Sequence, residues 1–348
     1  MPDKLLLTGA TGFLGYYLAH ALAAGGRRFL ALVRPGSKTD HLRELGEWCT
    51  LVEGDLTDPG SLQQAAVGVD TVIHAAAMIS FEDRREDDLL LVNGEGTADL
   101  VNAMLHARAR RLIHVGSVSA LDRRDGGPAV RVADRWPARR PTTAYARSKF
   151  AAEREVWRGQ AEGLSVAAVY PTTMVGAGDW KGRNTPSLWR YVNDGGRIYP
   201  RGAAGFVDVR DVARAVLTVL ERDLDGERFL LNAENLRWKT FFDRVAASLD
   251  VPAPRTGLSR WQSAALWPLA GAWARLTGAE PAFTRAKHRT AQATYRYDGS
   301  DYEAVTGNTY IPLASTFAET GQAFRISQTL GEGTPPTYLP LLSSHPLR

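Results

Sequence analysis

The sequence predicts an α/β fold in which helices cover both faces of a doubly wound parallel sheet. Short apolar runs that suit buried strands alternate with longer segments of helical periodicity from residue 4 to about residue 170. A glycine-rich turn joins the first of these strands directly to the first helix. Because the links between the elements are short, parallel strands joined by right-handed helical crossovers are the expected arrangement.

The composition narrows the classes of protein to which the chain can belong. Its 348 residues are enough for one large domain or for a large and a small one. The formal net charge of +4 suits anionic ligands, but the basic pairs carry no interleaved aromatic residues, so we expect no nucleic-acid partner. Cys49 is the only cysteine, which excludes an intrachain disulfide and a cysteine-based metal site.

The hydropathy pattern argues against a membrane protein. The most apolar segment, residues 264–274, is too short to span a bilayer and is broken by Pro268. No basic-then-apolar leader precedes the first strand. We therefore expect a cytoplasmic protein.

The turn after the first strand has the pattern of a diphosphate-binding loop. It reads Thr8-Gly9-Ala10-Thr11-Gly12-Phe13-Leu14-Gly15 and lies between an apolar strand and a helical pattern. The N–H groups and the dipole at a helix N-terminus favour negative charge, and glycines permit the tight turn and a close approach of the pyrophosphate. We expect this turn to bind a dinucleotide through Gly9, Thr11, Gly12, Phe13, Leu14 and Gly15.

The residues at the ends of the second and third strands indicate which type of nucleotide the site binds. Residues 28–33 form the second strand and Arg34 follows it. An acid at this place would bond the ribose 2′-hydroxyl, whereas an arginine accommodates a 2′-phosphate, so NADP(H) is favoured and NAD(H) is the alternative. After the third strand, Asp55 is expected either to cap the local turn or to face the adenine amino group, with Leu56 beside it.

The fourth strand, residues 71–74, leads into a run of small residues. Small side chains allow the backbone to approach a cofactor closely, and here they are Ala75, Ala76 and Ala77. His74 is expected to be a hydrogen-bonded structural residue, since no partner histidine or carboxylate lies at metal-ligand spacing. We therefore predict no metal site.

A tyrosine and a lysine follow the fifth strand at a spacing that suits acid–base chemistry. Residues 143–160 have a helical pattern, in which Tyr145 and Lys149 share one face. An ammonium group one turn away stabilises a tyrosinate and lowers the pKa of the phenol from its ordinary value of about 10. Ser117, at the end of the fifth strand, could orient a carbonyl or alcohol group through a hydrogen bond.

These motifs together resemble the extended short-chain dehydrogenases/reductases of the NAD-dependent epimerase/dehydratase family, on its dihydroflavonol-reductase-like side. The resemblance covers about residues 4 to 235 in the family's order and implies a Rossmann-type domain. The residues that carry it are Thr8–Gly15, Asp55-Leu56, His74–Ala77, Gly116-Ser117, Tyr145-Ala-Arg-Ser-Lys149, Tyr170-Pro171 and Phe206–Asp211.

The resemblance implies a catalytic group of Ser117, Tyr145 and Lys149. Asn93 falls where the family has an asparagine at a helix start, and it is expected to support this group. Ser119 remains a rival for the role of Ser117, because residues two apart in an extended chain face the same side. Further cofactor contacts are expected from Tyr145, Lys149 and Pro171.

The family contains both oxidoreductases and nucleotide-sugar epimerases or dehydratases, so departures from the family pattern matter. Val118 and Ser119 stand where the dehydratases carry an acidic pair. Ala204 and Gly205 stand where many sugar-nucleotide enzymes have an Arg-Asp that holds the substrate diphosphate. These departures favour an NAD(P)-dependent oxidoreductase that reduces a carbonyl or oxidises a secondary alcohol. The alternatives are an epimerase with tightly bound NAD and a non-catalytic cofactor-binding regulator.

The sequence also suggests a division of the chain. Residues 1–175 are expected to form the dinucleotide-binding domain, to which a helix and a strand return near 206–232. Residues 176–328 are expected to form a smaller, mainly helical part that binds the substrate. Residues 329–348 are expected to form an extended tail. The apolar and aromatic content of the second part suggests a hydrophobic or cyclic carbonyl compound. The family resemblance also suggests a homodimer.

Overall fold

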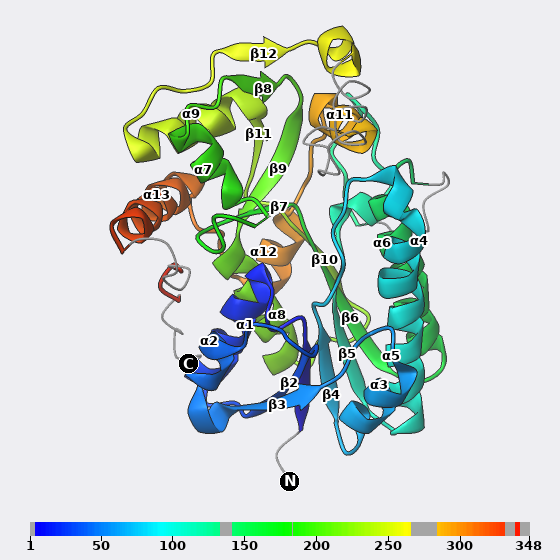
Figure 1. Ribbon diagram of the computed structural model, residues 1–348. Helices are drawn as coiled ribbons and strands as arrows, with labels where there is room; N and C mark the ends of the chain where they lie inside the picture. The colour runs from blue at the N-terminus through cyan, green and yellow to red at the C-terminus, as the bar shows by residue number, and fades with distance from the viewer. Residues whose placement is uncertain (1–3, 133–140, 183, 266–283, 331–337, 342–348) are drawn as a thin grey trace.

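The computed structural model describes residues 4–132, 141–182, 184–265, 284–330 and 338–341. Its centre is a seven-stranded, wholly parallel sheet with the strand order β10-β6-β5-β4-β1-β2-β3 (Figure 1). The strands are β1 (Leu5–Thr8), β2 (Phe29–Val33), β3 (Cys49–Glu53), β4 (Thr71–His74), β5 (Arg111–Val115), β6 (Ser165–Pro171) and β10 (Arg228–Leu231). The predicted doubly wound parallel sheet is confirmed.

The order of the strands reverses between β1 and β4. From β1 the chain proceeds to β2 and β3 on one side, and then crosses to β4, β5 and β6 on the other. Doubly wound folds bind their ligands at the carboxyl ends of the strands, at the point where the strand order reverses. The glycine turn after β1 and the alanines after β4 therefore meet at this edge.

Helices cover both faces of the sheet, as the alternating pattern predicts. On one face α1 packs against α8, and on the other α5 packs against α3 and α6 (Figure 1). The apolar side chains of both sheet faces are buried, including Leu7 and Ile73 towards α1 and Leu6 and Val72 towards α5. The helices are α1 (Phe13–Ala24), α2 (Asp40–Arg43), α3 (Pro59–Ala66), α4 (Glu86–Leu89), α5 (Gly96–His106), α6 (Ala144–Ala161) and α8 (Val209–Glu221).

The later part of the chain adds two small sheets and a helical layer above the carboxyl ends of the central strands (Figure 1). Trp189, Phe241 and Phe317 pack ring against ring in its core, with centroid separations of 5.6 to 6.0 Å around Trp189. Its strands are β7 (Thr173–Val175), β8 (Ile198–Pro200), β9 (Ala203–Asp208), β11 (Glu234–Arg237) and β12 (Thr256–Leu258). Its helices are α7 (Ser187–Asn193), α9 (Trp238–Leu249), α11 (Arg285–Gln292), α12 (Ser300–Thr306) and α13 (Leu313–Leu330).

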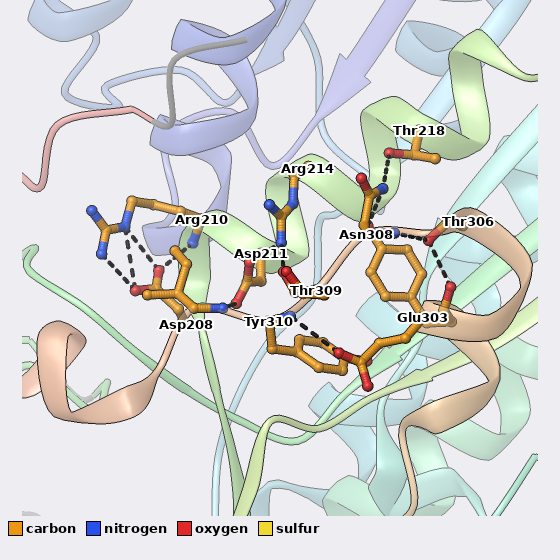
Figure 2. A network of polar contacts seen from close by, with 12 residues as sticks. Asp208, Arg210, Asp211, Arg214, Thr218, Glu303, Thr306, Asn308, Thr309 and Tyr310 are labelled. Carbon is orange, nitrogen blue, oxygen red and sulfur yellow. Dashed lines mark hydrogen bonds and ion pairs between the residues drawn. The ribbon is translucent and has the colours of Figure 1, made fainter. Parts of the chain in front are cut away.

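A buried polar network joins the start of α8 to the C-terminal region (Figure 2). Asp208, the N-cap of α8, accepts hydrogen bonds from the side chain of Arg210 and from the Thr316 hydroxyl. Asp211 accepts a bond from the Ile311 N–H at 2.8 Å and pairs with Arg214. The network thus fixes residues 309–316 on the central domain.

The C-terminal stretch was expected to be an extended tail, and most of it lies outside the described residues. Within the described part, Tyr338 stacks on Tyr16 with 3.3 Å between ring centroids. The Leu339 N–H donates to the Tyr17 hydroxyl at 3.1 Å, and that hydroxyl donates to the Ala177 carbonyl. Residues 338–341 therefore pack against α1. In the described part of the chain, every helix is too short or too polar to cross a bilayer.

Candidate active site

The glycine turn after β1 leaves no room for side chains at two of its positions. Gly9 has a φ of +77°, and a Cβ there would lie 2.6 Å from the Ala76 backbone nitrogen. A Cβ on Gly15 would lie 2.0 Å from the Gly9 carbonyl oxygen. Both positions therefore require glycine, the first for its left-handed backbone and the second for the close approach of α1 to the turn.

The N-terminus of α1 has the properties of an anion site. Gly12 is its N-cap and supplies no side-chain bond to the first N–H groups, which remain available to a ligand. Thr11 and Gly12 are exposed, whereas the Leu14 side chain is buried in the core. Leu14 can therefore contribute only its backbone to a ligand at this turn.

The residues predicted to surround the rest of a dinucleotide lie along the same edge of the sheet. Arg34 directly follows β2 and is exposed. The Ala75 and Ala76 backbone packs against Gly9, and the Ala76 N–H donates to the Thr8 hydroxyl at 3.2 Å. Asp55 accepts bonds from the Thr57 N–H and hydroxyl, both at 2.8 Å, so it closes a local turn. A dinucleotide fits this cradle of glycine turn, uncapped helix and small residues.

Ser117, Tyr145 and Lys149 come together at the carboxyl end of β5. Thr143 caps α6 by accepting a bond from the Ala146 N–H at 3.1 Å, which places Tyr145 in the first turn of the helix. The Ser117 side chain is close enough to the Tyr145 hydroxyl to lower the pKa of that phenol. Lys149 lies one turn further on, is 3% exposed, and donates from Nζ to the Val115 carbonyl at 3.1 Å.

Ser119, the alternative to Ser117, forms its hydrogen bonds with Ser117 itself. Ser119 donates from its hydroxyl to Ser117 Oγ at 2.8 Å, and Ser117 Oγ also accepts the Ser119 N–H at 3.2 Å. It is Ser117 whose side chain lowers the pKa of Tyr145. Ser119 thus fixes the orientation of Ser117 instead of replacing it.

Burial and nearby charges set the protonation of the two helix residues. Burial lowers the pKa of Lys149 to about 8, although the negative charge of Glu153 one turn further along α6 opposes this. Burial raises the pKa of Tyr145, while the hydrogen bond to Ser117 and the positive charge of Arg123 lower it. The sequence attributed the lowering to Lys149 alone. In the structure, the groups that lower it are Ser117 and Arg123, and the effect of Lys149 stays a prediction.

Asn93 supports the site from a distance, as a link between two chain segments. It lies in a π-helical turn, Leu90–Glu95, and is 2% exposed. Its Nδ2 donates to the Met78 carbonyl and to the Ser148 hydroxyl, each at 2.9 Å, and its Oδ1 accepts the Met78 N–H at 2.7 Å. Asn93 therefore ties the segment after β4 to the helix turn that carries Tyr145.

Two histidines lie behind Lys149 without carrying charge. His74 bonds to the Thr8 hydroxyl at 2.8 Å and to the Thr97 hydroxyl at 3.1 Å, which confirms its predicted structural role. Burial lowers the pKa of His74 to about 3 and that of His114 well below its usual value, and the charge of Lys149 lowers both further. Both histidines are therefore neutral near pH 7.

Sequence reasoning missed two charged residues at this site. Glu153 is 4% exposed and accepts bonds from the Trp157 indole and the Tyr170 hydroxyl. Its spacing of four from Lys149 on a helix was a usable signal. Arg123 had no such signal, because its partners, Tyr295 and Tyr297, are about 170 residues away in the chain.

The fold and the site together define a class: a dinucleotide-binding α/β enzyme with a tyrosine–lysine acid–base pair. The NAD dependent epimerase/dehydratase family profile matches residues 5–231, and the chain belongs to this family. Sterol demethylase protein B of Methylococcus capsulatus is 32% identical over 73% of this chain and 76% of its own length. Cinnamoyl-CoA reductase 1 of Oryza sativa subsp. japonica is 31% identical over 64% of this chain and 69% of its own.

A solved structure agrees over almost the whole chain. The crystal structure of gox2253 has a TM-score of 0.79 and 30% identity, and the match covers 93% of this chain and 98% of that one. The chain is an NAD(P)-dependent oxidoreductase of the extended short-chain dehydrogenase/reductase type.

Proposed function

We propose that the protein catalyses NADP(H)-dependent reduction of a carbonyl compound, or the reverse oxidation of a secondary alcohol, with Tyr145 as the acid or base. The observation that carries this proposal is that Tyr145 and Lys149 lie one turn apart on α6, with the Lys149 ammonium held at the end of β5, which Ser117 follows. This group stands at the sheet edge where the glycine turn offers its N–H groups. The similarity to a cinnamoyl-CoA reductase supports a reductive reaction.

Each residue then has a distinct part in the reaction. NADPH, when bound, supplies the hydride. Ser117 holds the substrate oxygen by a hydrogen bond. Tyr145 donates its proton to that oxygen as negative charge develops there. The Lys149 ammonium stabilises the resulting tyrosinate electrostatically, and general acid catalysis of this kind contributes roughly 10²- to 10⁴-fold.

The preference for NADP(H) rests on Arg34. It occupies the end of β2, where a ribose 2′-phosphate would lie, and it is exposed. Leu56, Phe13 and Pro171 complete the proposed contacts to the nucleotide, and residues 176–328 are proposed to bind the substrate. Dimerisation and a cytoplasmic location remain predictions.

Cofactor binding tests this proposal directly. The purified protein is first analysed for bound nucleotide and then titrated with NADPH and NADH by calorimetry. We expect tighter binding of NADPH, and about a tenfold loss of that affinity in Arg34→Asp, because a carboxylate repels the 2′-phosphate. Lys38→Asp, which changes charge nearby on the same loop, is the control and should change affinity less. Tightly retained NAD would instead favour the epimerase alternative.

A further inference from the structure

Arg123 lies six residues after Ser117, on the segment that follows β5, yet the proposed reaction gives it no part. It follows the 3-10 turn Val118–Ala120 after β5 and is partly buried. Its Nη1 donates to the Tyr297 hydroxyl at 3.2 Å. Its guanidinium carbon lies 4.6 Å from the centre of the Tyr295 ring, within the range of a cation–π interaction. Two aromatic side chains of the C-terminal region therefore hold this guanidinium in place.

The backbone fixes this arrangement as well. The segment after Arg123 pairs with the segment of the two tyrosines, because Val130 forms a bridge with Tyr297 and its N–H donates to the Arg296 carbonyl at 2.8 Å. The same guanidinium is close enough to Tyr145 for its charge to lower the pKa of that phenol. Arg123 thus stands at the junction of the catalytic tyrosine and the C-terminal region.

The guanidinium keeps most of its donors available. It has five N–H groups. Within the described ranges its one hydrogen bond is to Tyr297, and no carboxylate there forms an ion pair with it. Asp125, two residues along the chain, is engaged by Arg260 and by the Thr294 N–H. A guanidinium that is held in place, partly desolvated and without a carboxylate is well suited to bind an oxyanion through paired charge-assisted bonds.

We propose that Arg123 binds an oxyanion of the substrate, so that the enzyme prefers carbonyl compounds that carry a carboxylate near the reacting carbonyl. This inference rests on the proposed function, because it places the oxyanion beside the carbonyl that Tyr145 protonates. Lys149 cannot take this role, since it is buried and bonded to the Val115 carbonyl. Arg123 is a charged group that follows the end of β5, as Ser117 does, and is held by two tyrosines of the C-terminal region.

Matched pairs of substrates test the inference. The probes are 3- and 4-carboxybenzaldehyde and the methyl ester of each, reduced with saturating NADPH. For the wild-type enzyme we expect a higher kcat/KM for at least one acid than for its ester. In Arg123→Gln the acid-to-ester ratio should fall about tenfold or more, mainly through KM, because a charge-assisted pair is lost. Arg123→Lys should retain part of the preference.

Two further variants control for charge and position. Arg124→Gln removes the same charge from an exposed neighbouring residue and should leave the ratio unchanged. Tyr297→Phe removes the hydroxyl that holds Arg123 and should lower the ratio by a few fold. An equal change for acid and ester in Arg123→Gln would overturn the inference.

Failure of the proposed carbonyl reduction can be told apart from failure of the Arg123 site. If the wild-type enzyme reduces none of the four aldehydes, the proposed carbonyl reduction loses support. The Arg123 site is then measured alone, by calorimetric titration of 4-carboxybenzyl alcohol into the NADP⁺-loaded protein. Weaker binding to Arg123→Gln than to the wild type would support the inference, and equal or undetectable binding to both would contradict it.

Discussion

Two buried charged clusters of this protein differ in how completely their groups are bonded. At the start of α8, the Asp208 carboxylate accepts bonds from the Arg210 backbone and side chain (Figure 2). It also accepts a bond from the Thr316 hydroxyl. Arg210 in turn reaches Glu319 and the Pro340 carbonyl. At the start of α6, by contrast, the Lys149 ammonium has three donors, and its hydrogen bond is to the Val115 carbonyl.

This difference separates a structural cluster from a catalytic one. In the α8 cluster the buried charges are paired within the protein, which offsets the desolvation of each ion. In the α6 cluster, by contrast, no carboxylate among the described residues forms an ion pair with the Lys149 ammonium, and Ser117 lies beside it just after β5. We therefore expect changes in the α6 cluster to affect turnover and changes in the α8 cluster to affect the free energy of unfolding.

The largest expected effect is the loss of turnover in Tyr145→Phe. Removing the phenolic proton donor should lower kcat by about 10²- to 10⁴-fold, because general acid catalysis is lost. Thermal unfolding should change little, because the substitution removes one hydroxyl and keeps the aromatic ring. The control is Tyr310→Phe, a hydroxyl of the α8 region bonded to the Gly299 carbonyl, which should retain wild-type kcat. Comparable kcat values for Tyr145→Phe and Tyr310→Phe would contradict the distinction between a catalytic and a structural cluster.

Asp208→Ala should produce the opposite result. It leaves the Arg210 guanidinium, 6% exposed, with fewer partners, and breaking a buried ion pair costs about 3 kcal/mol of unfolding free energy. The folded fraction should still turn over substrate at the wild-type rate. Denaturant unfolding measures the loss, and Lys239→Ala, from an exposed pair with Asp243, is the control with a much smaller effect. Wild-type stability in Asp208→Ala would contradict the assignment.

The pH dependence of reduction should reveal the charge on Lys149. Its pKa is lowered to about 8, below the raised pKa of Tyr145, so Lys149 loses its proton first as the pH rises. The kcat/KM for carbonyl reduction should therefore fall about tenfold per pH unit above about pH 8. In Lys149→Arg, which stays charged, this decline should move to higher pH. An unchanged profile in that variant would show that another group titrates.

The smallest effect concerns Asp211 and appears in stability. Burial raises the pKa of Asp211 from 3.8 to about 7, against the lowering effect of Arg214. Between about pH 4 and pH 7, Asp211 is therefore protonated in the folded protein and ionised in the unfolded chain. Stability that this group contributes below pH 4 is lost as the pH rises through about 7. Asp211→Asn should flatten this slope in urea titrations at several pH values, and an identical slope would exclude the role.

The two clusters also differ in how far the sequence could predict them. Local spacing was sufficient to place Tyr145 and Lys149 on one helix face, and the family resemblance added Ser117 to them. Thr316 and Ile311, which bond to Asp208 and Asp211, lie about 100 residues further along, and the sequence gives no periodicity that links them. Arg123 was missed for the same reason. The glycine turn was predicted in detail because backbone conformation at Gly9 and Gly15 dictates the residue type.

Transfer of a labelled hydride tests the central claim most directly. The protein is incubated with NADPH deuterated at the nicotinamide C4, separately in each stereochemical position, and with the carboxybenzaldehydes and their esters. We predict that one of the two labels appears at the carbinol carbon of the alcohol, with one NADP⁺ formed per alcohol, and that Tyr145→Phe abolishes the transfer. No labelled alcohol, together with NAD that stays bound through purification, would contradict the account.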